Sequence, residues 1–254
     1  MSYKLLTNGL NKLDLSKKKV IVVGCGYMGH EYAKALSFLG INNVTLISST
    51  IKSAKECAQP YGYNYCDGGY ENIKDGLASF DLAIIATPTH KQKSATNHLI
   101  KFGIKNILIE KPGLLYSNEF KKWAKELTSK EVNVRIAYNR LLYPNLWKLK
   151  ELTAKEGGIS SCRYCFTEWL HRINFEKKTK LCYERFGIHN SLHVIGMAHY
   201  LIGTPVKHSG YRKGSLPWHP SGSIFVGSGL SEYDIPFSYH ADWDSGGRWG
   251  VEIT

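Results

Sequence analysis

A glycine pattern directly after a short apolar stretch is the feature that most constrains the fold of this chain. Residues 20–23 are all Val or Ile, and Gly24, Gly26 and Gly29 follow at the spacing Gly-x-Gly-x-x-Gly. In a strand, turn and helix, the first glycine permits a tight turn, the second admits a phosphate against the backbone, and the third lets the helix lie close to the strand. The helix then directs its positive end at the phosphates. The pattern predicts a dinucleotide-binding unit, and hence a nicotinamide enzyme.

The surrounding residues supply the context that this motif requires. Ala33, Leu36 and Leu39 recur at helical spacing after the glycines. We therefore expect a helix there, with Tyr27 and Met28 beside the cofactor at its start. The alternative is an ordinary glycine-rich turn in an α/β protein.

Length and composition are those of a folded protein. The chain has 254 residues, of which 43% are hydrophobic, enough for one large or two small domains. Residues 1–19 hold no apolar run long enough for a signal peptide, and no segment approaches the roughly 20 apolar residues that span a bilayer. We expect a cytoplasmic protein whose six cysteines are reduced. Cys162 and Cys165 have metal or redox spacing, but they fall in a predicted strand, where residues three apart face opposite sides.

Strand-like and helical stretches alternate through the first half of the chain, which predicts a doubly wound parallel sheet. The expected strands are 20–24, 43–48, 81–86, 105–109 and 132–138, and the expected helices are 28–40, 51–59, 90–102 and 117–130. After a helix at 142–156, strand-like runs follow at 159–169, 206–213, 222–229, 235–242 and 247–254, interrupted by a helix at 187–202. We therefore predict an α/β fold in which a Rossmann domain, 1–139, precedes a smaller α+β domain, 140–254, with a mainly antiparallel sheet.

The formal charge of +12 indicates an anionic partner. Lys121, Lys122, Lys125 and Lys130 fall on an amphipathic helical pattern, so they are expected on its solvated face and not in a DNA-binding stripe. No nucleic-acid-binding motif accompanies them. A charged small molecule explains the charge more simply than a nucleic acid or a membrane, and a generally basic surface without a specific ligand is the alternative.

The end of the second predicted strand bears on the choice between NAD and NADP. Ser48, Ser49, Thr50 and Lys52 stand where NAD-binding proteins normally carry an Asp or Glu. Hydroxyl groups and a lysine suit a 2′-phosphate, so this segment favours NADP. The same residues could instead serve as the N-cap of the next helix.

Two further strand ends carry polar residues. Thr87, Pro88 and His90 follow one strand, where the nicotinamide-side phosphate and ribose are expected, and Glu110 and Lys111 follow another. With Pro112, the last two form a Glu-Lys-Pro tripeptide downstream of the glycine motif and of Thr-Pro. Over most of its length the chain resembles the glucose-fructose oxidoreductase, inositol dehydrogenase and rhizopine-catabolism family (Gfo/Idh/MocA) of NAD(P)-dependent sugar oxidoreductases.

The resemblance assigns Lys111 to the active site, in contact with the substrate hydroxyl and the nicotinamide region. Glu110 and Pro112 would then fix its geometry, with a cis Lys-Pro bond. A lysine near a cationic nicotinamide can share in proton transfer when its pKa is depressed. Considered alone, Lys111 could be a solvated loop lysine.

The family also carries an Asp and, four residues later, a catalytic His on a helix of the second domain. By the resemblance, His193 matches that histidine and suits a general base, while His189 stands at the position of the Asp. Arg185, His189 and His193 are spaced four apart, which predicts one polar helix face. His-x-x-x-His is also a zinc spacing, but no adjacent Glu completes it, so we expect no metal. A structural pair of histidines is the other alternative.

The remaining substrate contacts are expected from placement. Asn139 and Arg140 follow the last parallel strand at the domain junction, and Arg172 and Arg185 could bind a phosphate or carboxylate, as in a nucleotide sugar or acidic sugar. Surface arginines in salt bridges are the alternative. By the resemblance, the second domain is shorter than usual, and we expect a homodimer through its sheet.

Two functions of different class follow. The first is an NADP- or NAD-dependent sugar or nucleotide-sugar oxidoreductase, with Lys111 and His193 handling the proton. The second is a catalytically inactive regulatory protein that binds dinucleotide or sugar on the same scaffold, an alternative kept open by His189.

Overall fold

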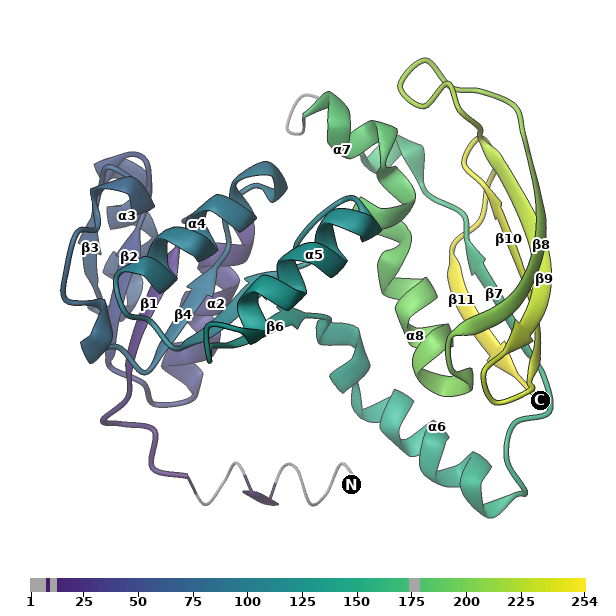
Figure 1. The fold of residues 1–254 in the computed structure, drawn as a ribbon, viewed down its shortest axis with the longest axis horizontal. Coiled ribbons are helices and arrows are strands. Elements are labelled where there is room, and N and C mark those ends of the chain that lie inside the picture. Colours follow the sequence, from purple (N-terminus) through teal and green to yellow (C-terminus); the bar gives the residue numbers. More distant parts are fainter. Residues whose placement is uncertain (1–7, 10–12, 174–178) are drawn as a thin grey trace. The chain divides into compact units, whose positions relative to one another are not determined.

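The computed structural model describes residues 8–9, 13–173 and 179–254. The chain divides into two compact units, and the division falls between Ala137 and Tyr138. Each unit is built on a sheet of its own, labelled in Figure 1.

The first unit is a six-stranded parallel sheet in the order β3-β2-β1-β4-β5-β6. Its strands are β1 (Lys19–Val23), β2 (Asn43–Ile47), β3 (Asn64–Cys66), β4 (Leu82–Ile85), β5 (Asn106–Glu110) and β6 (Asn133–Ala137). Its helices are α2 (Tyr27–Phe38), α3 (Ile51–Ala58), α4 (Thr89–Lys101) and α5 (Ser117–Thr128). The predicted doubly wound sheet is confirmed. The pattern misses only β3, whose three residues are all exposed.

The strand order of this sheet determines where a ligand can bind. The order in which successive strands are added reverses between β1 and β4, which are paired in parallel: β2 and β3 lie on one side of β1, and β4, β5 and β6 lie on the other. Ligands of such sheets bind beyond the carboxyl ends of the strands at this switch point. A ligand of this sheet is therefore expected at the turns after β1 and β4.

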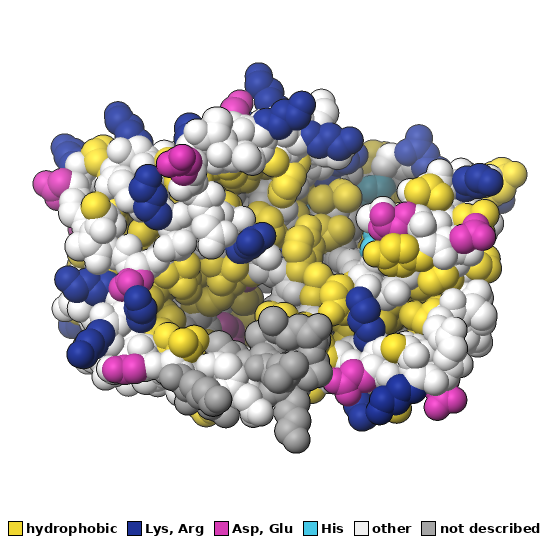
Figure 2. Space-filling view, turned by 60° about the horizontal axis from the view of Figure 1, so that its bottom comes forward, with side chains coloured by type: hydrophobic (Ala, Val, Ile, Leu, Met, Phe, Trp, Pro, Cys, Tyr) yellow, Lys and Arg dark blue, Asp and Glu magenta, His cyan; other side chains and the backbone are white. Residues whose placement is uncertain are grey.

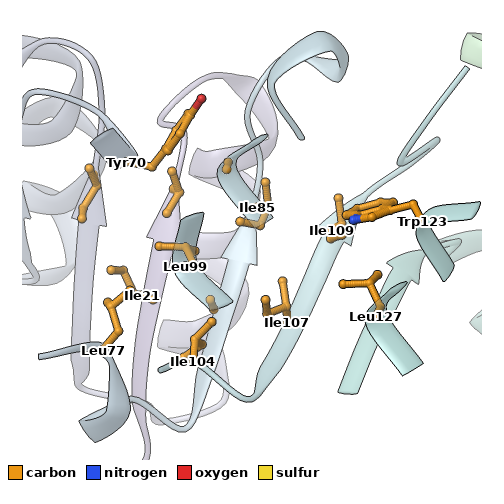
Figure 3. Packing of buried hydrophobic residues seen from close by; sticks show 14 residues of the cluster. Ile21, Tyr70, Leu77, Ile85, Leu99, Ile104, Ile107, Ile109, Trp123 and Leu127 are labelled. Carbon is orange, nitrogen blue, oxygen red and sulfur yellow. The ribbon is translucent and has the colours of Figure 1, made fainter. Parts of the chain in front are cut away.

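Two layers of buried side chains hold the helices against the sheet. One layer joins β4 and β5 to α4 and α5, with Leu99 and Trp123 both nearly inaccessible (Figure 3). The other joins β1 and β2 to α2 and α3, through residues such as Val44 and Ala33. Successive residues of β1 alternate between the two layers, as the strand period requires. Both faces of the sheet are thus covered.

The second unit is a five-stranded sheet in the order β11-β7-β10-β9-β8. Its strands are β7 (Cys162–Phe166), β8 (Pro205–Lys213), β9 (Ile224–Ser231), β10 (Pro236–Asp242) and β11 (Trp249–Ile253). Its helices are α6 (Pro144–Lys155), α7 (Lys180–Glu184) and α8 (Leu192–Ile202). Only β7 and β10 pair in parallel, so the predicted mainly antiparallel sheet is confirmed.

Helix α8 covers one face of this second sheet. Val194 and Ala198 are fully buried against β7 and β10, where Tyr164 and Phe237 belong to the same core. The opposite face carries exposed groups such as the Arg163–Glu252 ion pair, at 2.8 Å. All nine residues of β8, an edge strand among the described residues, are exposed.

The lysines of α5 lie where the amphipathic pattern predicts. Lys121, Lys122 and Lys125 are exposed, whereas Trp123 and Leu127 are buried. On the face shown in Figure 2, Lys and Arg side chains are scattered with Asp and Glu among them. Within the described residues, no helix is both long enough and apolar enough to cross a membrane.

Trp123 offers a test of the layer between the sheet and α5. Its side chain is 1% exposed and its Nε1 donates to Asn97 Oδ1 at 3.0 Å. Trp123→Ala should lower the free energy of unfolding by about 3–5 kcal/mol, measured by urea denaturation with circular dichroism, because it leaves a cavity in the core. Phe38→Ala, at a side chain 91% exposed, should cost less than about 0.5 kcal/mol. Equal losses in the two variants would contradict this packing.

Candidate functional site

The glycine turn lies at the switch point of the first sheet. Gly24 follows β1 with a φ of 105°, a conformation that favours glycine, and a Cβ there would lie 2.6 Å from the carbonyl carbon of Ala86. A Cβ on Gly29 would lie 2.1 Å from the carbonyl oxygen of Gly24. These two glycines therefore permit β1, α2 and the end of β4 to approach one another.

Gly26 differs from its two neighbours in the motif. It is the N-cap of α2, no side chain caps the helix there, and a Cβ at Gly26 would meet nothing within 4 Å. Packing within the protein therefore does not explain this glycine. Open space at an uncapped helix N-terminus is what an incoming phosphate requires.

The turn after β4 adds a polar atom to the same place. Thr87 Oγ1 is buried and has no hydrogen-bond partner among the described residues. A Cβ on Gly24 would lie 2.8 Å from the backbone nitrogen of Thr87, so the two turns are in contact. A buried hydroxyl group without a partner is costly unless a ligand or water satisfies it. The first unit thus fits a dinucleotide at the predicted position.

Other residues predicted to contact the cofactor lie around these turns. Tyr27 and Met28 begin α2, and the side chain of Tyr27 is 79% exposed. Pro88 is the N-cap residue of α4, and Pro88 and His90 are exposed.

The hydroxyl groups after β2 have partners within the protein. Thr50 is the N-cap of α3, and its Oγ1 accepts a hydrogen bond from the Ser53 backbone nitrogen at 3.4 Å. Ser48 is buried, with its Oγ 2.9 Å from Ser53 Oγ. Ser49 and Lys52 are exposed, and Lys52 Nζ lies 4.0 Å from a carboxylate oxygen of Glu56. The helix-capping alternative therefore holds for Thr50.

A carboxylate, that of Asp67, directly follows β3, the strand that the sequence pattern misses. The backbone nitrogen of Ser48 donates to the carbonyl of Cys66, at the end of β3, at 3.2 Å. Asp67 follows directly and is exposed. The carboxylate that normally accepts from the ribose of NAD stands about 20 residues after the glycines, at the end of the second strand, whereas Asp67 stands after β3.

The loop after β5 presents Lys111. Its peptide bond to Pro112 is cis, as the resemblance implies. Gln92 of α4, 1% exposed, joins this loop to the turn after β4. Its Oε1 accepts from the backbone nitrogen of Gly113 at 3.0 Å, and its Nε2 donates to the carbonyl of Thr87 at 3.4 Å. Gln92 thereby positions both loops, a role that a polar residue in a helical pattern does not reveal.

Glu110 is held at the end of β5 by α2. Tyr32 donates its phenolic proton to Glu110 Oε1 at 2.5 Å, and the carboxylate is buried. Burial, together with this bond to a carboxylate, raises the pKa of Tyr32 well above its ordinary value. Tyr32 therefore remains a donor at neutral pH and orients the residue that precedes Lys111.

The predicted histidine helix of the second unit is not a regular α-helix, which corrects the expectation of one polar face. A π-helical turn, Gly187–Ser191, contains His189 and precedes α8. Arg185 lies outside both elements, as the C-cap of α7. In a π turn the hydrogen bonds join residues five apart, so a spacing of four does not define one face across it. Such turns occur often at functional sites.

His193, in the first turn of α8, lies beside an aromatic ring of β11. The ring centres of His193 and Trp249 are 5.8 Å apart. The guanidinium carbon of Arg140 lies 4.4 Å from the centre of the same indole, a cation–π distance. Arg140 belongs to the 3-10 turn Asn139–Leu142, in which Asn139 is exposed. The predicted residues His193 and Arg140 are thus brought together by a tryptophan that the sequence reasoning did not single out.

The buried carboxylate of Glu168 forms a hydrogen bond with this tryptophan. Glu168 is 7% exposed, and its Oε1 accepts from Trp249 Nε1 at 2.8 Å and from Ser191 Oγ at 2.9 Å. It follows β7 by two residues. The rule used for β4 and β5, a polar residue just after an apolar strand, would have found it.

Two predicted arginines remain less defined. Arg172 ends the 3-10 turn Leu170–Arg172, and its side chain is outside the part of the chain that the structure describes. Arg185 is partly buried at the end of α7. Nearby in sequence, Trp169 contacts both His171, with ring centres 6.0 Å apart, and the guanidinium of Arg248, at 5.6 Å.

Across the described residues, no cluster of three or more His, Cys, Asp or Glu side chains could hold a metal ion. All six cysteines are free thiols.

Comparison with known proteins agrees with this fold. A glutamyl-tRNA reductase of Saccharolobus islandicus is 40% identical over 70 residues, which are 27% of this chain and 15% of that protein. An oxidoreductase from Thermotoga maritima is similar in structure, with a TM-score of 0.76, 21% identity and coverage of 94% of this chain and 76% of the other. A levoglucosan dehydrogenase in complex with NADH and levoglucosan has a TM-score of 0.72 and 20% identity, with coverage of 93% and 70%. At these identities the structural likenesses establish the fold.

Nearly all of the first unit also matches the sequence model of one protein family. Residues 18–138 match the Gfo/Idh/MocA model, described as an oxidoreductase family with an NAD-binding Rossmann fold. The match contains the glycine turn, Thr87 and the Glu-Lys-Pro tripeptide. The solved structures that resemble the chain include a sugar dehydrogenase. By this match and by its motifs, the first unit resembles the Gfo/Idh/MocA family of oxidoreductases with an NAD-binding Rossmann fold, and the match covers a little under half of the chain.

Proposed function

We propose that the protein is an NAD(P)-dependent oxidoreductase that transfers a hydride between the nicotinamide and a hydroxyl-bearing or keto carbon of a sugar, sugar derivative or nucleotide sugar. The glycine turn carries the proposal. Open space at Gly26, beside the unpartnered Thr87 hydroxyl, supports a bound pyrophosphate. The family match and a neighbour that holds NADH and levoglucosan support the reaction class.

Residues of the first unit would hold the cofactor. The backbone at Gly24 and Gly26 and the N-terminus of α2 offer N–H groups to the pyrophosphate. Tyr27, Met28 and Gly29 continue this contact along the helix. Thr87, Pro88, His90 and Glu110 would line the ribose and nicotinamide side, and Ser48, Ser49, Thr50 and Lys52 would surround the 2′-position.

Lys111 and His193 would take part in proton transfer. His189 would be the third member of this catalytic set. When bound, the nicotinamide would supply the hydride chemistry at the carbon of a CH–OH group. The hydroxyl proton passes to the His193 imidazole as the carbonyl double bond forms, and it returns from His193 during reduction. Lys111 donates a hydrogen bond to the same substrate oxygen. In the oxidation direction the substrate thus loses one hydride and one proton.

Arginines of the second unit support an anionic substrate. Arg140, Arg172 and Arg185, with Asn139 and His189, form the proposed substrate-binding set. The guanidinium carbon of Arg140 lies 4.4 Å from the centre of the Trp249 indole, and a guanidinium group can bind a carboxylate or phosphate bidentately. The net charge of +12 favours the same class of ligand.

The sheet of the second unit supports a homodimer. Its edge strand β8 is exposed along its whole length, with Val206 64% and Tyr211 78% exposed. An exposed edge or open face favours pairing with a second copy. Light scattering should then give about twice the chain mass of 28.7 kDa. A single-chain mass at micromolar concentration would contradict the dimer.

Cofactor binding tests the proposal directly. In a titration followed by tryptophan quenching, NADPH should bind more tightly than NADH, because Lys52 can pair with a 2′-phosphate. Lys52→Ala should weaken NADPH by roughly tenfold and leave NADH unchanged. Gly26→Ala should weaken both by at least about tenfold without loss of fold, because its Cβ meets only the pyrophosphate.

Two controls distinguish a preference for one of the two nucleotides from a failure to bind either of them. Asp67→Ala should leave NADPH binding intact, whereas a loss of NADH binding there would assign an NAD preference to Asp67. Binding of neither nucleotide to cofactor-free protein would overturn the enzyme hypothesis.

Turnover with a panel of sugars and acidic sugars tests the proton-handling residues. Lys111→Ala and His193→Ala should each lower kcat by roughly 10²–10⁴-fold while NADPH binding is retained. Lys122→Ala, at an exposed lysine of α5, is the matched control and should not change kcat. Tight dinucleotide binding without turnover on any substrate would favour the inactive regulatory protein.

A further inference from the structure

Gln92 is a polar residue on the buried face of α4. Its neighbours on that face, at helical spacing, are Ala95, Thr96 and Leu99, and all three are fully buried. Gln92 itself is 1% exposed. Burying a primary amide costs free energy unless its donor and acceptor groups are satisfied. The partners of the Gln92 amide therefore account for a glutamine at a core position.

The amide of Gln92 joins the loops that follow two paired strands, β4 and β5. Its Oε1 accepts from the backbone nitrogen of Gly113 at 3.0 Å, and its Nε2 donates to the carbonyl of Thr87 at 3.4 Å. These partners fix the orientation of the amide, because a backbone N–H can only donate and a carbonyl can only accept. One side chain thus connects the turn that holds the buried Thr87 hydroxyl with the loop that contains Lys111.

Gly113 has little room to move away from Gln92. Its φ is 80°, and a Cβ there would lie 2.8 Å from Ile136 Cδ1 of β6 and 3.2 Å from Phe120 Cε2 of α5. The backbone at Gly113 is therefore enclosed by β6 and α5 and bonded to α4. A change at Gln92 acts on the loop two residues after Lys111.

We propose that Gln92 is a positioning residue that couples occupancy of the dinucleotide site at Thr87 to the placement of the loop 111–113. The inference rests on the proposed function, in which the cofactor contacts Thr87 and Lys111 takes part in proton transfer. A cofactor group bound to the Thr87 hydroxyl would restrict the turn after β4. Because the carbonyl of the same residue is bonded to Gln92, this restriction extends to Gly113 and to the loop of Lys111.

Two substitutions separate the hydrogen bonds of Gln92 from its volume. Gln92→Met keeps a similar length but makes neither bond. In Gln92→Glu, a protonated carboxyl group can make both bonds, whereas an ionised one keeps the bond from Gly113 and turns an acceptor toward the Thr87 carbonyl. Burial raises the pKa of such a carboxyl group. This variant should therefore resemble the wild-type protein at acidic pH and lose the link to Thr87 as the pH rises.

Amide hydrogen exchange measures the coupling without turnover. In the wild-type protein, NADPH should slow exchange at Gly113 as well as at residues 24–29. In Gln92→Met, Gly113 should exchange roughly tenfold faster with or without NADPH, while residues 24–29 still respond. Thr96→Val is the matched control, because the Thr96 hydroxyl is equally buried but donates to the Gln92 backbone carbonyl within α4, at 2.8 Å. It should leave the response of Gly113 unchanged.

Kinetics connect the coupling to the reaction. In Gln92→Met, kcat should fall by roughly 10–100-fold while the Kd of NADPH changes by less than about threefold. In Gln92→Glu, kcat should be close to the wild-type value at acidic pH and fall as the pH rises, a limb that an amide cannot produce. Equal losses of kcat in both variants at every pH would indicate a purely structural role and overturn the inference.

The exchange experiment also distinguishes this inference from the proposed function. Protection of residues 24–29 without a response at Gly113 in the wild-type protein, or an unchanged response of Gly113 in folded Gln92→Met, would overturn the inference alone. If Gln92→Met does not fold, a response of Gly113 that persists in Gln92→Glu at every pH would overturn it instead. A coupled response of Gly113 in a protein that turns over no substrate would contradict the proposed reaction and leave the coupling standing.

Discussion

The close approach of the glycine turn to the end of β4 is the constraint on which the first unit depends. Any side chain at Gly24 would collide with Ala86, and any side chain at Gly29 would collide with the carbonyl of Gly24. Their absence allows α2 to begin directly above the sheet at the point where strand order reverses. The free helix N-terminus, the space at Gly26 and the buried Thr87 hydroxyl all follow from that approach.

Buried polar side chains also fix the positions of the loops that follow β4 and β5. Gln92 connects the turn after β4 to the loop that carries Lys111, and Tyr32 of α2 holds Glu110. In the second unit, Glu168 performs the equivalent task for Trp249 and Ser191. In both units the loops are thus positioned by hydrogen bonds from regular elements, which is how a rigid scaffold orients reactive groups.

Patterns of apolar residues predict most elements of this protein. In the amphipathic α5 the buried residues Trp123 and Leu127 recur at helical spacing, whereas β1 is a continuous apolar run, as expected for a strand that is covered on both faces. Such patterns fail where burial or geometry is irregular. Strand β3 is entirely exposed, and the π turn at His189 inserts a residue that changes which side chains share a face.

Within the site, sequence reasoning finds residues at motif positions and misses those that act through contacts between elements. Lys111 and the glycines stand out because the motif fixes their spacing. Gln92, Trp249 and Glu168 are ordinary residues in their local patterns, and their role arises only from partners about 20 to 80 residues away. No local period encodes such pairings, so they require the tertiary structure.

Amide hydrogen exchange with and without NADPH tests whether the glycine turn is a pyrophosphate site. On binding, we expect slower exchange at residues 24–29, where backbone N–H groups would meet the phosphates, and at residues 86–88. The exposed strand β8 should exchange at the same rate in both states. Binding of NADPH that leaves residues 24–29 unprotected would contradict a pyrophosphate site at the glycine turn, because the ligand would then lie elsewhere on the protein.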